Sequence, residues 1–510
     1  MLARVASAAV LGIDAYLVDV ETDIANGLPS FATVGLPHGA VKEGRERVNS
    51  AIHNAGYLFP LQRITVNLAP ADIRKEGSAF DLPIALGILA ATGQIDAKGL
   101  RGFLVMGELG LDGEVRPIRG ALSMAVAAEQ AGCTGMILPA ANVREAAVVG
   151  ALDVRGARTL AEVVRHLDGG PPLARASVDL DALFAARASD DVDFLEVKGQ
   201  EHAKRALEVA AAGAHNLLMV GPPGSGKTML ARRLPTILPA MAVAEALETT
   251  KVHSVAGMLP PGESLIATRP FRSPHHTISD AGLIGGGSYP RPGEVSLAHH
   301  GVLFLDELPE FRTNVLEVLR QPMEDGAVTL SRAAMSLSYP ARFMLAAAMN
   351  PCPCGFHGST VRGCGCTPTE VRRYLARVSG PLLDRIDLHL DVPAVAYRQL
   401  SDERSGEPSA AIRERVSRAR AMQQERFAGR RGVFANAHMA PRDIRACCRL
   451  TDGADAILRT AITRLGLSAR AYHRTLKIAR TIADLAAAVA IEPLHVSEAI
   501  QYRTLDRGIP

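Results

Sequence analysis

The hydrophobic and polar positions form successive patterns along the chain. Over residues 1–167, short β-rich runs such as 64–68 and 103–106 alternate with alanine-rich helical runs such as 41–55. This alternation predicts an α/β or α+β domain. The first apolar run, residues 1–11, is short and acidic positions follow it at once, so we expect a first β-strand there rather than a targeting segment.

A second pattern occupies residues 193–393. Apolar runs at 216–220, 302–305 and 343–348 alternate with helical stretches, which predicts a mostly parallel sheet. Residues 168–192 carry turn formers and charges at both ends and are expected to be a linker. The last region, residues 394–510, predicts amphipathic helices at 410–427, 454–465, 469–487 and 496–504.

Composition adds little to this picture. The chain has 510 residues, of which 48% are apolar and 21% charged, as in a globular protein of about three domains. The net charge of +3 is too small to indicate a partner, so nucleic acid would need local basic patches. No apolar run reaches the roughly 18–20 residues that span a bilayer. We therefore expect a cytoplasmic protein with no membrane partner.

Residues 221–228 match the pattern G-x-x-x-x-G-K-[ST] between a predicted strand and a predicted helix, which is the setting that a phosphate-binding loop (P-loop) requires. Its glycines let backbone N–H groups close around the phosphates of ATP. We expect Lys227 to reach the β- and γ-phosphates and Thr228 to ligate Mg²⁺. The candidate ATP-binding residues are Gly221, Pro222, Pro223, Gly224, Ser225, Gly226, Lys227 and Thr228.

Two acidic residues follow the apolar run 302–305. Four consecutive apolar residues suit a strand that is buried on both faces, and parallel sheets bind ligands at the carboxyl ends of their strands. We expect Asp306 to hold Mg²⁺ and Glu307 to polarise the attacking water.

Three segments resemble the magnesium-chelatase-like AAA+ proteins, most closely their ComM/YifB competence branch. They are GVLFLDELPEF at residues 301–311, RPFRSPHHT at 269–277 and GEVSLAHHG at 293–301. The resemblance extends over nearly the whole chain. It implies an AAA+ P-loop core, a C-terminal helical lid, a homo-hexameric ring and ATP hydrolysis between subunits. In the ComM branch it implies a helicase that promotes branch migration on single-stranded or branched DNA during DNA uptake and recombination.

The same resemblance implies roles for further residues. Asn350, after the run 343–348, is similar to sensor 1, which faces the γ-phosphate or the attacking water. Arg385, in the segment LLDRID, is similar to the arginine finger that reaches a neighbouring subunit's ATP. Arg470, in the segment SAR, is similar to sensor 2 and would act on its own chain's ATP. Residues 194–200 are implied to line the adenine pocket. From the residues alone, a strand-end asparagine and surface arginines remain the alternative.

Basic residues concentrate between the two ATP motifs, where the resemblance implies an insert in helix 2 of the core. They are Arg269, Arg272, His275, His276, Arg291, His299 and His300. A candidate hairpin at 327–342 carries Arg332 near its tip. Such loops could bind DNA phosphates, and the alternative is solvated charges or contacts between subunits. Adjacent histidines in one strand would point to opposite faces, which argues against a metal site at either histidine pair.

Four of the seven cysteines lie within fifteen positions, which favours a reducing compartment and a metal over a disulfide scaffold. Cys352, Cys354, Cys364 and Cys366 could supply four thiolates to a tetrahedral zinc ion. The spacing is C-x-C rather than the usual C-x₂-C, and His357 could replace one ligand. Free thiols are the alternative. Zinc held by four thiolates would be structural, and it could brace the loop that follows Asn350.

Residues 75–82 and 107–118 resemble the Lon-protease-type domain, an α+β fold of the S5 domain 2-like kind. The alignment places Ala79 at the position of the protease's nucleophilic serine and Leu122 at that of its lysine base, so we expect the fold without proteolysis. A displaced Ser78–Lys75 pair leaves an ATP-dependent protease open. A protein remodeller or metal-chelatase-type motor is a further alternative that would use the same ATP site.

Overall fold

The computed structural model describes the chain except residues 74, 76, 187–191, 261, 288–289, 333–334, 360–361, 396–405, 431–432, 466–467 and 504–510. It separates into two compact units. The first comprises Met1–Ala186 and Val243–Ala267, and the second comprises Arg187–Ala242 and Thr268–Pro510. Each unit has its own hydrophobic core.

A mixed sheet of seven strands organises the first unit, in the order β3-β4-β2-β1-β5-β8-β9. The strands are β1 Leu2–Leu11, β2 Asp14–Ala25, β3 Ser30–Val34, β4 Arg63–Ala69, β5 Phe103–Val105, β8 Gly135–Pro139 and β9 Asp153–Ala157. β1 and β2 form an antiparallel hairpin in which Val5 pairs with Val20, and both side chains are buried. The first apolar run is therefore a strand, as its pattern predicts.

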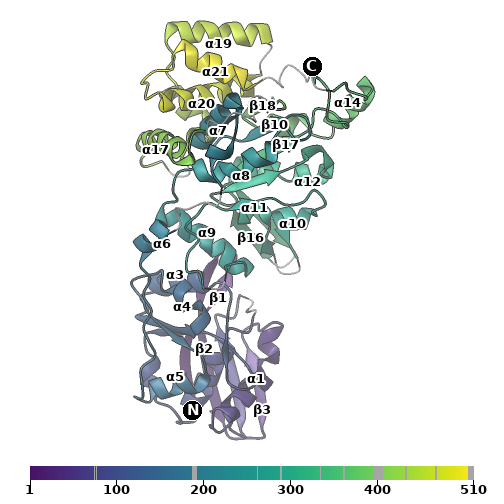
Figure 1. Ribbon diagram of the computed structural model, residues 1–510. Helices are drawn as coiled ribbons and strands as arrows, with labels where there is room; N and C mark the ends of the chain where they lie inside the picture. Colours follow the sequence, from purple (N-terminus) through teal and green to yellow (C-terminus); the bar gives the residue numbers. More distant parts are fainter. Residues whose placement is uncertain are drawn as a thin grey trace. The chain divides into compact units, whose positions relative to one another are not determined.

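Helices and a short hairpin complete the first unit (Figure 1). They are α1 Ala40–Asn54, α2 Asp81–Ala91, α3 Ala121–Gln130, α4 Val143–Ala146, α5 Leu160–Leu167 and α6 Leu180–Ala186, with β6 Glu108–Leu109 paired to β7 Val115–Arg116. α2 contacts β1 and β2. It is apolar on all sides and almost wholly buried, as expected of a central core helix.

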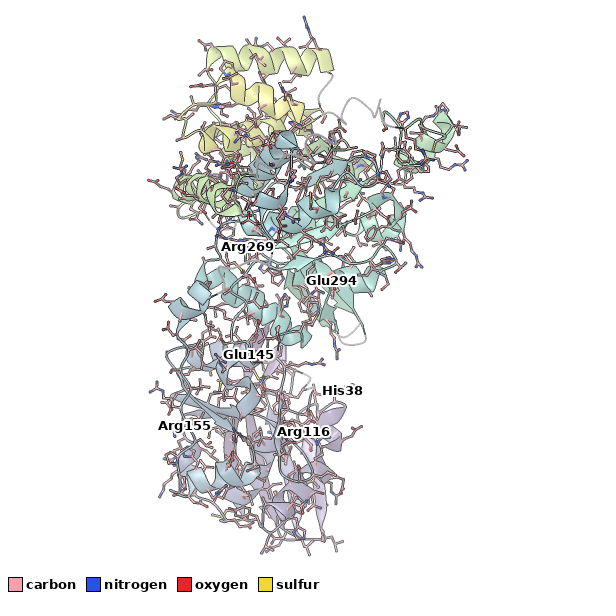
Figure 2. All side chains as sticks on the ribbon, in the orientation of Figure 1. His38, Arg116, Glu145, Arg155, Arg269 and Glu294 are labelled. Atoms are coloured by element: carbon pink, nitrogen blue, oxygen red, sulfur yellow. The ribbon has the colours of Figure 1, made fainter. Side chains whose placement is uncertain are left out.

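One helix of the first unit comes from a distant part of the sequence. α9, Val243–Ala256, packs against α3. Ser254 Oγ donates to the buried Glu145, which Figure 2 labels, and accepts from the N–H of Gly120 at 2.9 Å. Glu145 also accepts from the N–H of Leu122 at 2.9 Å, so a carboxylate satisfies the first turn of α3. Residues 243–267 therefore belong to this unit, although they fall in the range 193–393 that the sequence pattern assigns to the ATPase core.

Five parallel strands form the sheet of the second unit, in the order β11-β14-β17-β10-β18. Their bounds are β10 Leu217–Val220, β11 Phe271–Arg272, β14 Val302–Leu305, β17 Met344–Met349 and β18 Leu388–Asp391. Every residue of β10, β14 and β17 is buried, which confirms for β14 the burial on both faces that the apolar run 302–305 predicts. Val220 lies beside Met349 and Asp391, so three strands end together at one edge.

Shorter elements surround this sheet. They are α7 Glu201–Gly213, α8 Lys227–Ile237, α10 Asp280–Ile284, α11 Glu294–Leu297, α12 Thr313–Glu317, α13 Arg320–Asp325, α14 Pro368–Leu375 and α15 Gly380–Leu383, with the hairpins β12 Gly285–Gly286 to β13 Arg291–Pro292 and β15 Ala327–Arg332 to β16 Met335–Pro340. The second hairpin is the one that the sequence predicts at 327–342.

The C-terminal part of the second unit is helical, in green to yellow in Figure 1. Its helices are α17 Ser409–Arg426, α18 Pro441–Cys447, α19 Asp452–Leu465, α20 Ala469–Leu485 and α21 Pro493–Gln501. α17 and α20 contact α7, and their buried apolar residues join the core around the parallel sheet. The four predicted helices are confirmed, and residue 504 lies outside the described residues. Within the described chain, no helix combines the length and apolarity needed to cross a bilayer.

Candidate nucleotide site

The P-loop connects β10 to α8 at the carboxyl edge of the parallel sheet. Gly226 caps α8 with φ of 89°, a conformation that glycine adopts without steric cost. Residues with side chains would be strained there, which explains the glycine of the motif. The strand, loop and helix expected around residues 221–228 are all present.

The Lys227 side chain is held by oxygen atoms of the loop and of β17's end. Its Nζ donates to the carbonyl oxygens of Gly221 at 2.7 Å and Pro222 at 2.9 Å, and to Asn350 Oδ1 at 3.2 Å. Burial lowers the pKa of Lys227, and the nearby Asp306 opposes that shift. The structure therefore brings the P-loop lysine and the expected sensor asparagine into direct contact.

The two expected Mg²⁺ ligands are also in contact. Thr228 Oγ1 donates to Asp306 Oδ2 at 2.6 Å, and the N–H of Glu307 donates to Asp306 Oδ1 at 2.9 Å. A hydroxyl and a carboxylate are hard oxygen donors of the kind that Mg²⁺ takes. The residues present therefore fit Mg²⁺ beside the P-loop.

Glu307 lies at the end of β14 with φ of 53°, which is uncommon for a residue other than glycine. Its side chain is 58% exposed, and its Oε2 is 3.6 Å from Nδ1 of His276. Sequence reasoning did not connect His276 with this site. Strand order would have found it: β11 ends at Arg272 and runs parallel to β14, so the residues after β11 come to the same sheet edge as Glu307.

Gln200 also contacts the P-loop, although no motif assigns this residue an individual role. It closes the segment 194–200 that was expected to line the adenine pocket. Its Nε2 donates to the carbonyl oxygen of Ser225 at 2.6 Å and to that of Pro393 at 3.3 Å. The amide thus ties the P-loop to the residues that follow β18.

The two histidine pairs do not have the predicted strand geometry. None of the four residues lies in a strand, and each pair brings its rings together instead of pointing them apart. The ring centroids of His275 and His276 are 4.1 Å apart, and those of His299 and His300 are 3.8 Å apart. His299 is fully buried and its Nδ1 accepts from the N–H of Arg342 at 3.0 Å.

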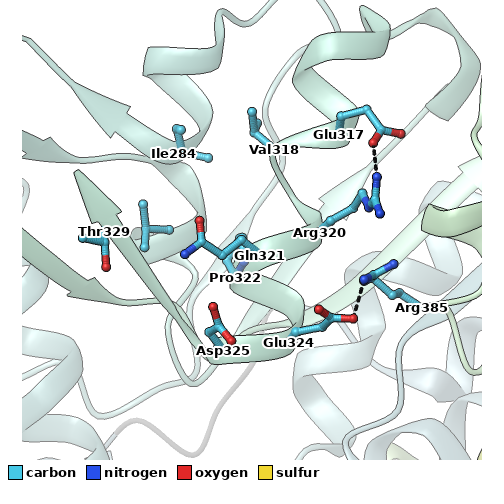
Figure 3. A pocket seen from close by; sticks show the side chains of 11 residues that line it. Ile284, Glu317, Val318, Arg320, Gln321, Pro322, Glu324, Asp325, Thr329 and Arg385 are labelled. Carbon is cyan, nitrogen blue, oxygen red and sulfur yellow. Dashed lines mark hydrogen bonds and ion pairs between the residues drawn. The ribbon is translucent and has the colours of Figure 1, made fainter. Parts of the chain in front are cut away.

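Arg385 is buried beside a pocket of about 420 Å³ (Figure 3). Its side chain is only 10% exposed, forms an ion pair with Glu324 and donates to the carbonyl oxygen of Pro381 at 2.7 Å. Arg470 is 67% exposed and lies 3.7 Å from Asp384. Both arginines line one further pocket of about 350 Å³, and none of its described lining residues belongs to the P-loop.

Two arginines of the basic segment are engaged inside the chain. Arg269 donates to the carbonyl oxygens of Pro239 and His300, both at 2.7 Å. Arg272 forms a bidentate pair with Glu294 at 2.6 and 2.7 Å; Figure 2 labels Arg269 and Glu294. Their guanidinium groups therefore stabilise the loop itself. The side chain of Arg332 lies outside the described residues.

The four clustered cysteines converge after β17. Cys352 Sγ lies 3.4 Å from Cys354 Sγ and 3.7 Å from Cys364 Sγ, and the latter two sulfurs are 3.6 Å apart. Cys366 joins them, with all four sulfurs within 4.8 Å of one another. Backbone hydrogen bonds from Phe356 and Gly365 lower the pKa of Cys354 to about 6. At Cys364 and Cys366 a backbone hydrogen bond is outweighed by burial and the neighbouring sulfurs, so the pKa values of both thiols are raised.

The residues of the alternative protease site are not paired. Ser78 Oγ donates to Glu108, whereas the buried Nζ of Lys75 has no hydrogen-bond partner among the described residues. Burial lowers the pKa of Lys75. A serine hydrogen-bonded to a carboxylate and not to the lysine lacks the base arrangement of a Ser–Lys dyad.

Comparison with known proteins places this geometry in a family. The profile described as "Magnesium chelatase, subunit ChlI" matches residues 193–400, "Subunit ChlI of Mg-chelatase" matches residues 20–142, and "Magnesium chelatase, subunit ChlI C-terminal" matches residues 406–503. The chain is 46% identical to competence protein ComM of Haemophilus influenzae, over 99% of this chain and 98% of ComM.

Two other relatives define the breadth of the similarity. Identity to the YifB protein of Escherichia coli is 44%, over 99% of this chain and 98% of YifB. Identity to the magnesium-chelatase 38 kDa subunit of Rhodobacter capsulatus is 28%, over 31% of this chain and 50% of that subunit. The chain therefore belongs to the ComM/YifB family of magnesium-chelatase-like proteins.

Proposed function

We propose that this protein is an ATP-driven DNA motor, which assembles as a homo-hexameric ring and moves branch points in single-stranded or branched DNA. The observation that carries the ATPase part is the constellation at one sheet edge. There Lys227 contacts Asn350, Thr228 contacts Asp306, and Glu307 follows directly. These are the groups that phosphoryl transfer to water requires: a phosphate-binding cation, magnesium ligands and a carboxylate base.

Each side chain has a defined task in this proposal. Lys227 and the backbone N–H groups of the P-loop bind the phosphates. Thr228 and Asp306 would hold Mg²⁺, which neutralises phosphate charge when bound. Glu307 accepts a proton from the attacking water, and His276 Nδ1 lies 3.6 Å from its carboxylate. Asn350 orients the water or the γ-phosphate.

The proposal assigns both Arg385 and Arg470 to the ATP of a neighbouring subunit. The family resemblance implies instead that Arg470 acts on its own chain's ATP. Arg470 lines the same pocket as Arg385, which supports the assignment of both arginines to the same neighbouring ATP. The Arg385–Glu324 ion pair would have to open when the neighbour's ATP is engaged, so hydrolysis would depend on assembly.

The DNA part of the proposal is supported by the sequence relationship. A relative with 46% identity bears the name competence protein, and the segments quoted above resemble the ComM branch. Because Arg269 and Arg272 are engaged internally, DNA contacts would fall to other residues, such as the exposed Arg291 and the hairpin β15–β16. We assign the first unit to a non-proteolytic Lon-like domain and the C-terminal helices to a lid over the nucleotide.

The family profiles also favour a second candidate function. They describe a magnesium chelatase subunit, so a motor acting on a protein partner would use the same ATP site. Any metal at the cysteine cluster would be structural in either case, because four thiolates leave no open coordination position for catalysis.

A branch-migration assay distinguishes the candidates. The full-length protein is incubated with a labelled four-way junction and ATP, at low salt and at concentrations that support rings. ATP-dependent conversion of the junction to duplex products, which is absent with Glu307→Gln, would support the DNA motor. Unchanged junctions with an ATPase that remains active would contradict it and favour the protein-directed motor.

A further inference from the structure

The geometry of the cysteine cluster is that of a mononuclear metal site. A tetrahedral ion with metal–sulfur bonds of about 2.3 Å separates its sulfurs by roughly 3.8 Å. The sulfur separations of 3.4, 3.6 and 3.7 Å around Cys352, Cys354 and Cys364 come close to that value. In an iron–sulfur cluster the cysteines bind different iron atoms, so their sulfurs lie farther apart. Here all four sulfurs lie within 4.8 Å of one another, which is too close for such a cluster. Four soft thiolates in this geometry select zinc.

The cluster ties together two parts of the nucleotide site. Cys352 is buried and lies two residues after Asn350, while Cys366 lies one residue before Thr367, the N-cap of α14. Tyr374 of α14 is buried; burial raises the pKa of its hydroxyl, and the nearby backbone of Asn350 opposes that rise. A metal ion on the four sulfurs would therefore close the loop between β17 and α14 and fix the position of Asn350.

The same loop packs against the P-loop. Gly355 has φ of 83°, and a Cβ atom added to it would lie 2.5 Å from Cδ of Pro223. Real Cβ atoms do not approach another carbon so closely. The backbone between the two C-x-C pairs is thus in close contact with a residue that encloses the ATP phosphates.

We infer that the four cysteines bind a structural zinc ion that holds this loop against the P-loop, so that zinc occupancy controls ATP affinity. This inference rests on the proposed ATP site. Binding replaces the thiol protons by the metal. Without it, several thiolates or thiols packed at 3.4 to 3.7 Å lose their common ligand, and the loop is free to move away from Pro223.

Metal content and nucleotide affinity of the full-length protein test the inference together. Bound metal is measured by mass spectrometry on protein purified from cells grown in zinc-containing medium. Nucleotide affinity is measured with a fluorescent ATP analogue before and after a chelator removes the metal. We expect about one zinc per chain and a loss of affinity of about tenfold on removal, which zinc restores and which equals about 1.4 kcal/mol. Protein that carries no zinc, or carries iron instead, would overturn the metal assignment.

Matched glycine variants separate the contact from the metal. Gly355→Ala introduces the clash with Pro223 without touching a thiol, so it should keep the zinc and weaken nucleotide binding. Gly358→Ala lies in the same loop with φ of 72° but has nothing within 4 Å of its Cβ position, so it carries similar backbone strain and should bind nucleotide normally. Equal affinities for the two variants would overturn the coupling.

Cysteine variants complete the test. Cys366→Ser should lose zinc and nucleotide affinity together, whereas Cys133→Ser, far from the cluster in sequence, should lose neither. If Cys366→Ser misfolds, the glycine pair still decides the outcome. Failure of the DNA-motor proposal would show as missing junction movement, with zinc content and ATP affinity still coupled, so the two failures are distinguishable.

Discussion

At the scale of single residues, the ATP chemistry depends on side chains whose positions are set by local contacts. Lys227 is oriented by two P-loop carbonyls, and Thr228 is oriented by Asp306. Glu307 is different, because its side chain is more than half exposed and His276 Nδ1 lies 3.6 Å from its carboxylate. An exposed carboxylate at the end of a buried strand is free to meet a water molecule, which suits a general base.

Glu307→Gln should separate binding from hydrolysis. The amide keeps the size of the side chain but cannot accept the proton of water, so the hydrolysis rate should fall by about 100-fold or more while nucleotide affinity is retained. The matched control is Glu310→Gln, a residue of the same turn that pairs with Arg377 and should hydrolyse ATP normally. An equal loss in both variants would show that the turn, and not the base, is responsible. Single-turnover hydrolysis and fluorescent-nucleotide titration provide the two measurements.

At the scale of elements, the structure fixes the C-terminal helices to the end of the parallel sheet through Asp387. Its carboxylate pairs with Arg474 of α20 and accepts from the N–H of Asn216 at 3.1 Å. Burial alone would raise the pKa of Asp387, but Arg474 and His215 together outweigh it and hold the pKa far below the ordinary 3.8. Such a group stabilises the fold above pH 3.8, and that contribution is lost progressively as the pH falls further.

Asp387→Asn tests this link. Removing one partner of a buried ion pair costs about 3 kcal/mol at neutral pH, so the thermal unfolding midpoint should drop. Below pH 3.8, the unfolding midpoint of the variant should fall less steeply with decreasing pH than that of the unaltered protein. Asp19→Asn, an exposed position on β2, serves as the control. If the unfolding midpoints of the Asp387→Asn variant and the unaltered protein depend on pH in the same way, Asp387 does not stabilise the fold as described.

Sequence reasoning placed these elements well where a single pattern decides them. β10, β14 and β17 are continuous apolar runs buried on both faces, and α20 lies where its helical pattern predicts it. Sequence patterns did not predict the contacts that depend on tertiary structure. The contact between His276 and Glu307 follows from strand order, and the packing of α9 on the first unit follows from Ser254 and Glu145. Neither pairing leaves a periodic signal in the sequence.

At the scale of the whole molecule, the proposed function requires an ATP site that two neighbouring chains complete. Arg385 is held by Glu324 within its own chain, and it lines a pocket with no described P-loop residue. A ring in which each chain supplies arginines to its neighbour would explain both facts, and it predicts that activity rises with assembly and with DNA.

Steady-state ATP hydrolysis of the full-length protein over a range of protein concentrations tests this most directly. It is measured alone, with single-stranded DNA, with duplex and with a four-way junction, beside Glu307→Gln and Arg385→Ala. We expect specific activity to rise with protein concentration, single-stranded or branched DNA to stimulate it strongly, and both variants to abolish the stimulation. Hydrolysis that is independent of concentration and indifferent to every DNA at low salt would contradict a DNA motor that works between subunits.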